Sequence, residues 1–272
     1  MDAGALALVG PGRAGTAITA ALVARGWTVA TVAGRSDPSV AASAERFAAT
    51  PTTVDEAGRD ADLVVLATPD TALPTVAATV APGLEPGSLV VHLSGASTLA
   101  VLDPIGCLRP DVRLGSLHPL QTLPGGADAH ERLEGAWCAI EGPVVELAES
   151  LGMHPIVVAP DSRRIYHAAA SIASNHLVAL LGSVERLADD AGVPFEAFLP
   201  LVRAAVDNVA ELGPAAALTG PVARGDAATV AAHLDALPAE ERAAYRAGAA
   251  LARELAQVHS TDLSAILDEQ VA

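Results

Sequence analysis

The feature that most constrains this chain is a set of three glycines near its start, Gly10, Gly12 and Gly15, spaced as G-x-G-x-x-G. Residues 5–9 before them are apolar, as in a buried strand, and residues 16–25 after them carry apolar side chains at helical spacing. A strand, a glycine turn and a helix in this order begin a dinucleotide-binding fold. We therefore predict that the phosphates of a dinucleotide bind where this helix starts.

Each glycine has a separate reason to be in such a turn. Gly10 allows the tight bend after the strand, Gly12 leaves room for a pyrophosphate to approach the backbone, and Gly15 lets the helix pack closely on the sheet. Free N–H groups and the helix dipole favour negative charge at this point. The alternative is an ordinary strand, turn and helix without a ligand. The predicted phosphate-binding residues are Gly10, Pro11, Gly12, Arg13, Ala14 and Gly15.

The end of the second predicted strand distinguishes between the two nicotinamide dinucleotides. An NAD site places an Asp or Glu about 20 residues after the glycines. Here Gly34, Arg35 and Ser36 follow the strand, and no carboxylate stands at its tip, although Asp37 comes next. Because a guanidinium and a hydroxyl suit a 2′-phosphate, these residues favour NADP over NAD. The alternative is a solvated arginine in a turn.

Composition excludes several classes of function. The formal net charge of −16 argues against nucleic acid or an anionic membrane surface as a partner, because phosphates would be repelled. All 16 basic residues are arginine, so no lysine can act as an acid, a base or a Schiff-base former. Cys107 and Cys138 have no metal-binding or redox spacing, and we expect no metal site. We also expect no signal peptide and no membrane span, and predict a cytoplasmic protein.

The order of strands and helices predicts two domains. Short apolar runs alternate with helical segments up to residue 159, which implies a doubly wound, mostly parallel sheet of the Rossmann type. Beyond it only helices are expected, the first running from Asp161 to about Asp190. We predict an α/β NADP-binding domain over residues 1–159 and an all-α domain for substrate binding and dimerisation over residues 160–272. The expected strands are residues 6–9, 28–32, 63–67, 89–93, 114–117, 137–140 and 156–158.

Polar residues that follow the strands are candidates for the site, because ligands of such sheets bind beyond the carboxyl ends of the strands. His118 follows one strand, and a histidine there can protonate a carbonyl oxygen as hydride arrives. The alternative is a loop histidine bonded to backbone. His92 lies inside a strand and is interpreted as structural. The residues expected near the cofactor are Thr68, Pro69, Ser94 and Gly95.

The first helix of the second predicted domain carries His167, Ser171 and Asn175 at i, i+4 and i+8, which places them on one face. A polar stripe among apolar neighbours indicates a cleft or small packing residues, since buried polar groups need partners in either case. Ser171 and Asn175 are candidate catalytic residues, and His167 is a candidate substrate contact. A later glycine- and proline-rich loop adds Thr219 and Arg224. Arg224 either anchors a substrate carboxylate or pairs with a neighbouring carboxylate.

Together these motifs resemble the 6-phosphogluconate dehydrogenase-like reductases, in which a Rossmann domain precedes an all-helical domain. Residues 166–175 and 218–226 are more similar to a bacterial family of Rossmann-like proteins with a C-terminal domain of unknown function. The superfamily includes ketopantoate reductases, pyrroline-5-carboxylate reductases, 3-hydroxyisobutyrate dehydrogenases and prephenate dehydrogenases. The resemblance rests on the glycine pattern, Ala67-Thr-Pro-Asp70, Ser94-Gly95, Ser116-Leu-His-Pro119 and Asn175.

The resemblance implies a nicotinamide-dependent reductase with one departure. In the hydroxyisobutyrate and 6-phosphogluconate enzymes, a helical Lys-x-x-x-Asn pair serves catalysis. Asn175 matches the asparagine, but Ser171 stands in the place of the lysine, so the lysine-based mechanism does not carry over. His118 resembles the His-Pro segment of prephenate dehydrogenases, which favours a histidine as the proton-transfer group. The superfamily often dimerises through its helical domain, so a homodimer is expected.

We therefore expect NADP(H)-dependent hydride transfer to or from a small, anionic, carboxylate-bearing carbonyl compound similar to ketopantoate. In this interpretation His118 donates the proton, Asn175 orients the carbonyl, Ser94 and Ser171 complete the polar pocket, and Arg224 holds the carboxylate. One alternative is an imine reductase of the pyrroline-5-carboxylate type, whose substrate can be protonated already. Another is a non-catalytic protein that senses NADP.

Overall fold

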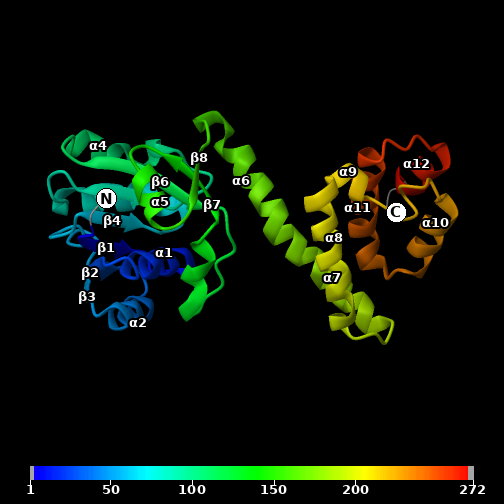
Figure 1. The fold of residues 1–272 in the computed structure, drawn as a ribbon, viewed down its shortest axis with the longest axis horizontal. Helices are drawn as coiled ribbons and strands as arrows, with labels where there is room; N and C mark the ends of the chain where they lie inside the picture. The colour runs from blue at the N-terminus through cyan, green and yellow to red at the C-terminus, as the bar shows by residue number, and fades with distance from the viewer. Residues whose placement is uncertain (1–2, 269–272) are drawn as a thin grey trace. The chain divides into compact units, whose positions relative to one another are not determined.

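The computed structural model describes residues 3–268 and divides into two compact units, residues 1–174 and 175–272 (Figure 1). The sequence predicts a boundary near residue 159, just after the last strand, whereas the division between the units falls after Ser174. The physical reason is that the first helix after the sheet stays attached to it. Arg163 and Tyr166 of that helix bind Ser116 and His118 of a central strand.

The first unit is built on one eight-stranded sheet in the order β3-β2-β1-β4-β5-β6-β7-β8. Strands β1 to β6 are parallel, β7 is antiparallel to β6, and β8 is parallel to β7. This confirms the predicted Rossmann-type, mostly parallel sheet. The strands are β1 Ala5–Val9, β2 Thr28–Ala33, β3 Thr50–Thr52, β4 Leu63–Leu66, β5 Leu89–His92, β6 Arg113–Pro119, β7 Trp137–Glu141 and β8 His154–Val157.

Helices cover both faces of the sheet and make three layers. Successive residues of a strand point to opposite faces, so Leu6 and Leu8 pack on one side while Ala7 and Val9 pack on the other. Each leucine buried in this way contributes roughly 1.5–3 kcal/mol. The Leu6 face is covered by α1 (Arg13–Val23), α2 (Asp37–Phe47) and α5 (Val145–Ser150), and the Ala7 face by α3 (Leu73–Val80) and α4 (Asp103–Leu108).

Strand β3 was not among the expected strands. It is only three residues long, its central residue is Pro51, and its side chains are exposed or half-buried. Such a strand has no apolar run to distinguish it from a loop, and proline is tolerated because the strand lies at the edge of the sheet.

The long helix expected over residues 161–190 consists of four segments. A 3-10 helix, Pro160–Ser162, leads into α6 (Arg163–Ser171), and a π-helical turn, Ile172–His176, leads into α7 (Leu177–Asp190). A π-helical turn winds more slowly than an α-helix. The constant spacing of four therefore does not define one face from Ser171 to Asn175, which corrects the expected polar stripe.

The second unit is helical, as predicted. Its small core consists of Val222, Val230, Leu234, Ala249, Leu263 and Leu267. Asp226 caps the start of α10, where its carboxylate accepts a hydrogen bond from the backbone N–H of Thr229 at 3.0 Å. After α7 the helices are α8 Leu199–Leu212, α9 Pro214–Ala217, α10 Ala227–Ala236, α11 Ala239–Leu255 and α12 Thr261–Asp268.

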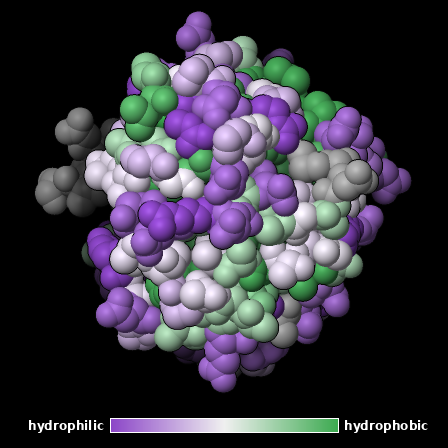
Figure 2. Space-filling model, turned by 90° about the vertical axis from the view of Figure 1, so that its left-hand side faces the viewer, coloured by the Kyte–Doolittle hydropathy of each residue, from purple (hydrophilic) through white to green (hydrophobic). Residues whose placement is uncertain are grey.

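The surface of the first unit is mixed in character. Figure 2 shows hydrophobic residues scattered among hydrophilic ones on the face turned toward the viewer. Within residues 3–268, no helix is both long and apolar enough to cross a lipid bilayer.

Candidate functional site

The glycine loop after β1, residues 10–15, has the geometry that its spacing predicts. Gly10 has φ +90°, and a Cβ placed on it would lie 2.8 Å from the backbone oxygen of Ala67. A Cβ on Gly15 would lie 2.7 Å from the Cβ of Ala67, so the start of α1 approaches the sheet closely. A Cβ on Gly12 would meet no atom within 4 Å. Two of the glycines therefore allow close packing, and Gly12 leaves open space.

The open side of this loop can receive an anion. Gly12 is the N-cap of α1 and brings no side chain to cap the first N–H groups of the helix. Those groups and the helix dipole therefore attract negative charge. Thr68, which follows β4, has a buried hydroxyl without a hydrogen-bond partner among the described residues, and its methyl carbon would lie 2.9 Å from a Cβ on Gly10. The open space and the unpaired hydroxyl fit the pyrophosphate of a dinucleotide.

The end of β2 packs against the glycine loop. A Cβ on Gly34 would lie 2.9 Å from the Cδ of Pro11. Arg35 and Ser36 are exposed beside it, and Ser36 precedes α2 without making a side-chain cap bond. The guanidinium of Arg35 makes no hydrogen bond or ion pair with any residue between 3 and 268. It is therefore free to bind a phosphate.

A second group of polar side chains lies on the face of the sheet that α3 and α4 cover. We call it the histidine cluster, and it consists of His92 on β5, His118 on β6, and Arg163, Tyr166 and His167 on α6. The rings of His118 and Tyr166 meet edge-on with centroids 5.6 Å apart, and those of His118 and His167 lie 5.8 Å apart. The Nδ1 atom of His118 is 2.9 Å from the hydroxyl oxygen of Tyr166.

Arg163 is the buried cation of this cluster. Its side chain is fully buried; its Nη2 donates to the hydroxyl of Ser116 at 2.7 Å and lies 3.6 Å from a carboxylate oxygen of Glu141. Its Nε and Nη1 have no hydrogen-bond partner among the described residues. Ser116 pairs in the sheet with His92 on one side and Glu141 on the other. A polar row thus crosses three strands beneath the guanidinium.

Desolvation lowers the pKa of the buried His92 and of the half-buried His118. The pKa of His118 falls to about 4 because the ring is desolvated and because His167 and Arg163 repel its positive charge, while Asp70 opposes the shift. The pKa of His92 also falls to about 4, mainly through burial and then through Arg163. Both rings are therefore neutral at neutral pH. A neutral imidazole carries one N–H and one bare nitrogen, so His118 can donate one hydrogen bond and accept another.

The structure brings Gly95, His118 and His167 together. A Cβ on Gly95 would lie 2.6 Å from Nε2 of His118 and 2.7 Å from Cδ2 of His167, so only glycine fits between the rings. His118 lies within β6 rather than after it. Ser94 is buried, and its hydroxyl accepts the backbone N–H of Ser97 at 3.0 Å, which gives it a local structural role. Pro69 is exposed after β4.

The other predicted site residues lie at the end of α6 or in the second unit. Ser171 is half-buried at the last position of α6, and Asn175 is exposed in the π-helical turn. Arg224 is exposed and forms no ion pair within the described residues, because the carboxylate of Asp226 serves as a helix cap instead. Thr219 lines a cavity of about 460 Å³ in the second unit.

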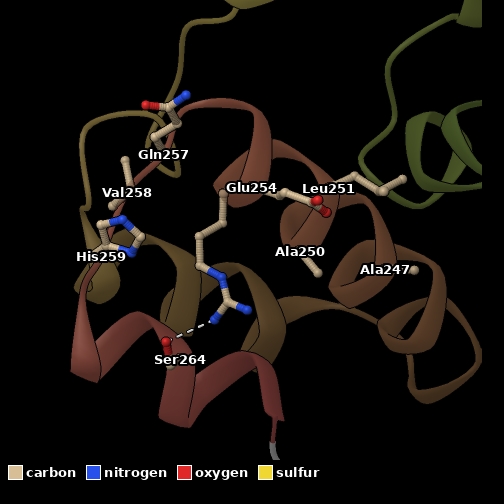
Figure 3. A pocket seen from close by; sticks show the side chains of 9 residues that line it. Ala247, Ala250, Leu251, Glu254, Gln257, Val258, His259 and Ser264 are labelled. Atoms are coloured by element: carbon tan, nitrogen blue, oxygen red, sulfur yellow. Dashed lines mark hydrogen bonds between the residues drawn. The ribbon is translucent and has the colours of Figure 1, made fainter.

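Neither of the two hollows found in the second unit contains a residue of the histidine cluster. The cavity at Thr219 is lined mainly by apolar residues of α7 and α11, with His233 and Tyr245 hydrogen-bonded at 2.7 Å. The other hollow lies between α11 and the segment that leads into α12, where Arg253 donates a hydrogen bond to the hydroxyl of Ser264, the labelled end of the dashed line in Figure 3. That hydrogen bond measures 2.8 Å.

Arg163, Tyr166 and Glu141 were not among the predicted site residues. Arg163 and Tyr166 lie three residues apart at the start of α6 and share a helix face with His167. Ser116 and His118 alternate along β6 and so share a sheet face. These two spacings were the available signals, but neither shows that the helix face and the sheet face meet.

Two family models match the chain. Residues 4–118 match a Rossmann-like domain, and residues 134–252 match a domain of unknown function, DUF2520. The two matches follow one another along the chain, which confirms the expected combination of a Rossmann-like domain with a domain of unknown function. Among curated proteins, none matches it.

Solved structures are similar to the chain over nearly its full length. A "putative NADP oxidoreductase" from Bacteroides fragilis shares 24% identity and a TM-score of 0.79, covering 94% of this chain and 99% of that one. A protein from Thermotoga maritima shares 25% identity and a TM-score of 0.66, with coverage of 93% and 98%. A pyrroline-5-carboxylate reductase from Coxiella burnetii shares 17% identity and a TM-score of 0.58, with coverage of 98% and 97%. These similarities establish the fold.

Proposed function

We propose that the protein is an NADP(H)-dependent oxidoreductase that transfers hydride to or from a small, carboxylate-bearing carbonyl compound. The observation that carries the proposal is the position of two features on one sheet. The glycine loop follows β1, and Gly95 and His118 lie at the ends of β5 and β6, which run parallel to β1. The carboxyl ends of parallel strands share one edge, where ligands of such sheets bind.

The glycine loop would hold the pyrophosphate of the cofactor, and Arg35 with Ser36 would hold the 2′-phosphate of NADP. The bound nicotinamide supplies or accepts the hydride. Two similar structures support this class, one of them named an NADP oxidoreductase and the other a pyrroline-5-carboxylate reductase.

His118 would handle the proton. As hydride reaches the carbonyl carbon, the carbonyl oxygen gains negative charge, which the N–H of His118 would stabilise by a hydrogen bond. The proton that yields the alcohol would pass through His118 after the bare ring nitrogen has taken a proton from water, so that the ring ends in its neutral form. Because the ring is neutral, it acts first as a hydrogen-bond donor to the oxygen. No lysine exists in the chain to share this task.

Cofactor choice is tested by titrating the protein with NADPH and NADH. We expect NADPH to bind more tightly, and Arg35→Ala to weaken NADPH binding about 10-fold while NADH binding stays unchanged, because a charge-assisted hydrogen bond is worth roughly 1.5–3 kcal/mol. Arg203→Ala, which removes an exposed arginine of α8, is the matched control. Equal affinity for both cofactors in the wild type would contradict the choice of NADP.

The role of His118 is tested with a panel of small 2-oxo acids. His118→Ala is expected to lower turnover about 10²-fold while NADPH affinity stays the same, since general acid catalysis contributes at least this much. A variant that turns over at the wild-type rate would exclude His118 from the chemistry.

An imine reductase of the pyrroline-5-carboxylate type is the second candidate. The similarity to the Coxiella burnetii reductase, which spans almost both chains, favours it, as does the neutral state of His118, because a protonated imine needs no acid. Cyclic imines added to the same panel separate the two, since His118→Ala should leave imine turnover nearly intact. NADPH binding without turnover on any compound would instead favour a sensing protein.

We also propose that the protein is a homodimer through its helical unit. Large apolar side chains are exposed along α7 and α8, and exposed apolar surface of this kind is typical of interfaces. Light scattering after size-exclusion chromatography should give a dimer, and Leu201→Asp should shift it toward the monomer, whereas Leu108→Asp on α4 should not. The exposed residues are Leu177, Val178, Leu180, Leu201, Val206, Val209 and Leu212.

A further inference from the structure

The hydroxyl of Tyr166 is the only hydrogen-bond partner of the His118 ring within the part of the chain that the structure describes. It lies 2.9 Å from Nδ1, and the two rings meet at 88°. The other ring nitrogen, Nε2, faces Gly95, where even a methyl group would lie at 2.6 Å. The two nitrogens of His118 therefore have different surroundings. Nδ1 is hydrogen-bonded to a hydroxyl, whereas Nε2 faces the backbone of a residue that has no side chain.

The groups around His118 keep its ring neutral. Arg163 and His167 on α6 and His92 on β5 all oppose a positive charge on the ring, and only Asp70, after β4, favours one. The neutral ring has one bare nitrogen, which is a good acceptor. A phenol donates more readily than it accepts, so the stable arrangement has the Tyr166 O–H pointing at a bare Nδ1.

We infer that Tyr166 is a positioning residue that donates its hydroxyl hydrogen to Nδ1 of His118 and so holds the ring hydrogen on Nε2. The catalytic consequence rests on the proposed function, because Nε2 is then the atom that presents a hydrogen at the edge of the sheet where the substrate oxygen would gain negative charge. The tautomer itself does not depend on that function. The partner of one ring nitrogen sets the state of the other.

The tautomer is measured by long-range ¹H–¹⁵N NMR on protein labelled at histidine, without cofactor or substrate, at neutral pH. His118→Gln assigns the His118 signals by their loss. In the wild type we expect a protonated Nε2 and a bare Nδ1. In Tyr166→Phe, which keeps the ring but removes the hydroxyl, we expect both tautomers to be populated.

The chain contains its own matched control. It has only two tyrosines, and Tyr245 makes the same kind of bond to Nδ1 of His233, at 2.7 Å, in the second unit. Tyr245→Phe should leave the His118 signals unchanged. Melting curves of both variants report folding, and the wild-type spectrum decides the identity of the tautomer even where Tyr166→Phe does not fold.

Two results would overturn the inference, namely a hydrogen on Nδ1 in the wild type, or an undiminished Nε2 tautomer in folded Tyr166→Phe. Where the substrate panel yields turnover, Tyr166→Phe should lower kcat about 10-fold or more with NADPH affinity unchanged, as for other residues that orient a reacting histidine. If no compound turns over, the proposed function fails while the NMR result stands.

Discussion

The glycine loop and the histidine cluster both lie on the sheet of the first unit, but they are built in opposite ways. The loop offers exposed backbone N–H groups and the open space left at Gly12. The cluster is crowded and partly buried, and its properties come from side chains on β5, β6 and α6 that repel or bind one another. The glycine loop is open to an anion because it lacks side chains. The histidine cluster lowers the pKa of His118 because side chains surround its ring.

This difference separates what each region contributes. A backbone site such as the glycine loop holds a ligand of fixed shape and carries little charge of its own. The cluster holds a buried cation, since Arg163 is buried with two nitrogens unpaired within the described residues, and it disfavours a second positive charge on His92 or His118. We therefore expect pH and charge substitutions to act on the cluster and steric substitutions to act on the loop.

The largest expected effect is that of pH on the stability of the cluster. The folded-state pKa values of His92 and His118 lie near 4, below the ordinary value of 6.5. Between these values the unfolded chain binds more protons than the folded one, so stability is complete above pH 6.5 and is lost as pH falls toward 4. Each histidine contributes at most about 1.4 kcal/mol per pH unit.

Urea unfolding followed between pH 7 and pH 4.5 measures this loss. His92→Gln should make the dependence on pH shallower, because one of the two titrating groups is gone. Stability that stays flat over this range in the wild type would show that the cluster does not hold its histidines neutral.

The next largest effect is expected from Arg163→Ala. The change removes the hydrogen bond to Ser116, leaves Glu141 without its cation and creates a cavity, which should cost about 3 kcal/mol. Arg164→Ala, at the exposed neighbouring position, should change stability by less than about 0.5 kcal/mol. Equal losses for both variants, measured by urea unfolding, would mean that Arg163 is not held as described.

A smaller effect distinguishes two glycines of the loop. Gly15→Ala places a methyl group 2.7 Å from the Cβ of Ala67 and should cost about 1–3 kcal/mol of stability. Gly12→Ala meets no atom and should leave stability unchanged, while it weakens NADPH binding about 10-fold by occupying the space for the pyrophosphate. Thermal melting and NADPH titration of both variants test this, and unchanged NADPH affinity in Gly12→Ala would place the cofactor elsewhere.

Much of the fold was predictable because it rests on local patterns. The apolar runs of β1, β2, β4, β5, β6 and β7 and the glycine spacing are contiguous in the chain, so hydrophobic pattern and the steric needs of the turn are enough to predict them. Strand β3 carries no such pattern because of Pro51. The π-helical turn at residues 172–176 could not be predicted, because its residues have the pattern of an ordinary α-helix.

The candidate site was predictable only in part. His118 and Gly95 were proposed because they follow predicted strands, where ligands of such sheets bind, although His118 lies inside β6 in the structure. Arg163 was not, because arginines are rarely buried and nothing local marks this one as an exception. Its burial depends on Ser116 and Glu141, which lie 47 and 22 positions away along the chain, and only the folded sheet brings all three together.

The polar row across β5, β6 and β7 makes the contacts of the buried Arg163 guanidinium depend on the register of these three strands. Ser116 stands between His92 and Glu141 only in the native alignment of the three strands. A slip of β6 by one residue would turn every side chain of that strand to the opposite face. Arg163 would then face the apolar side chain of Leu117, and His118 would lie in the hydrophobic core on the opposite face of the sheet. A misaligned sheet would therefore lose the polar contacts that hold α6, so Arg163, whose charge lowers the pKa of His118, also favours the native alignment of β6.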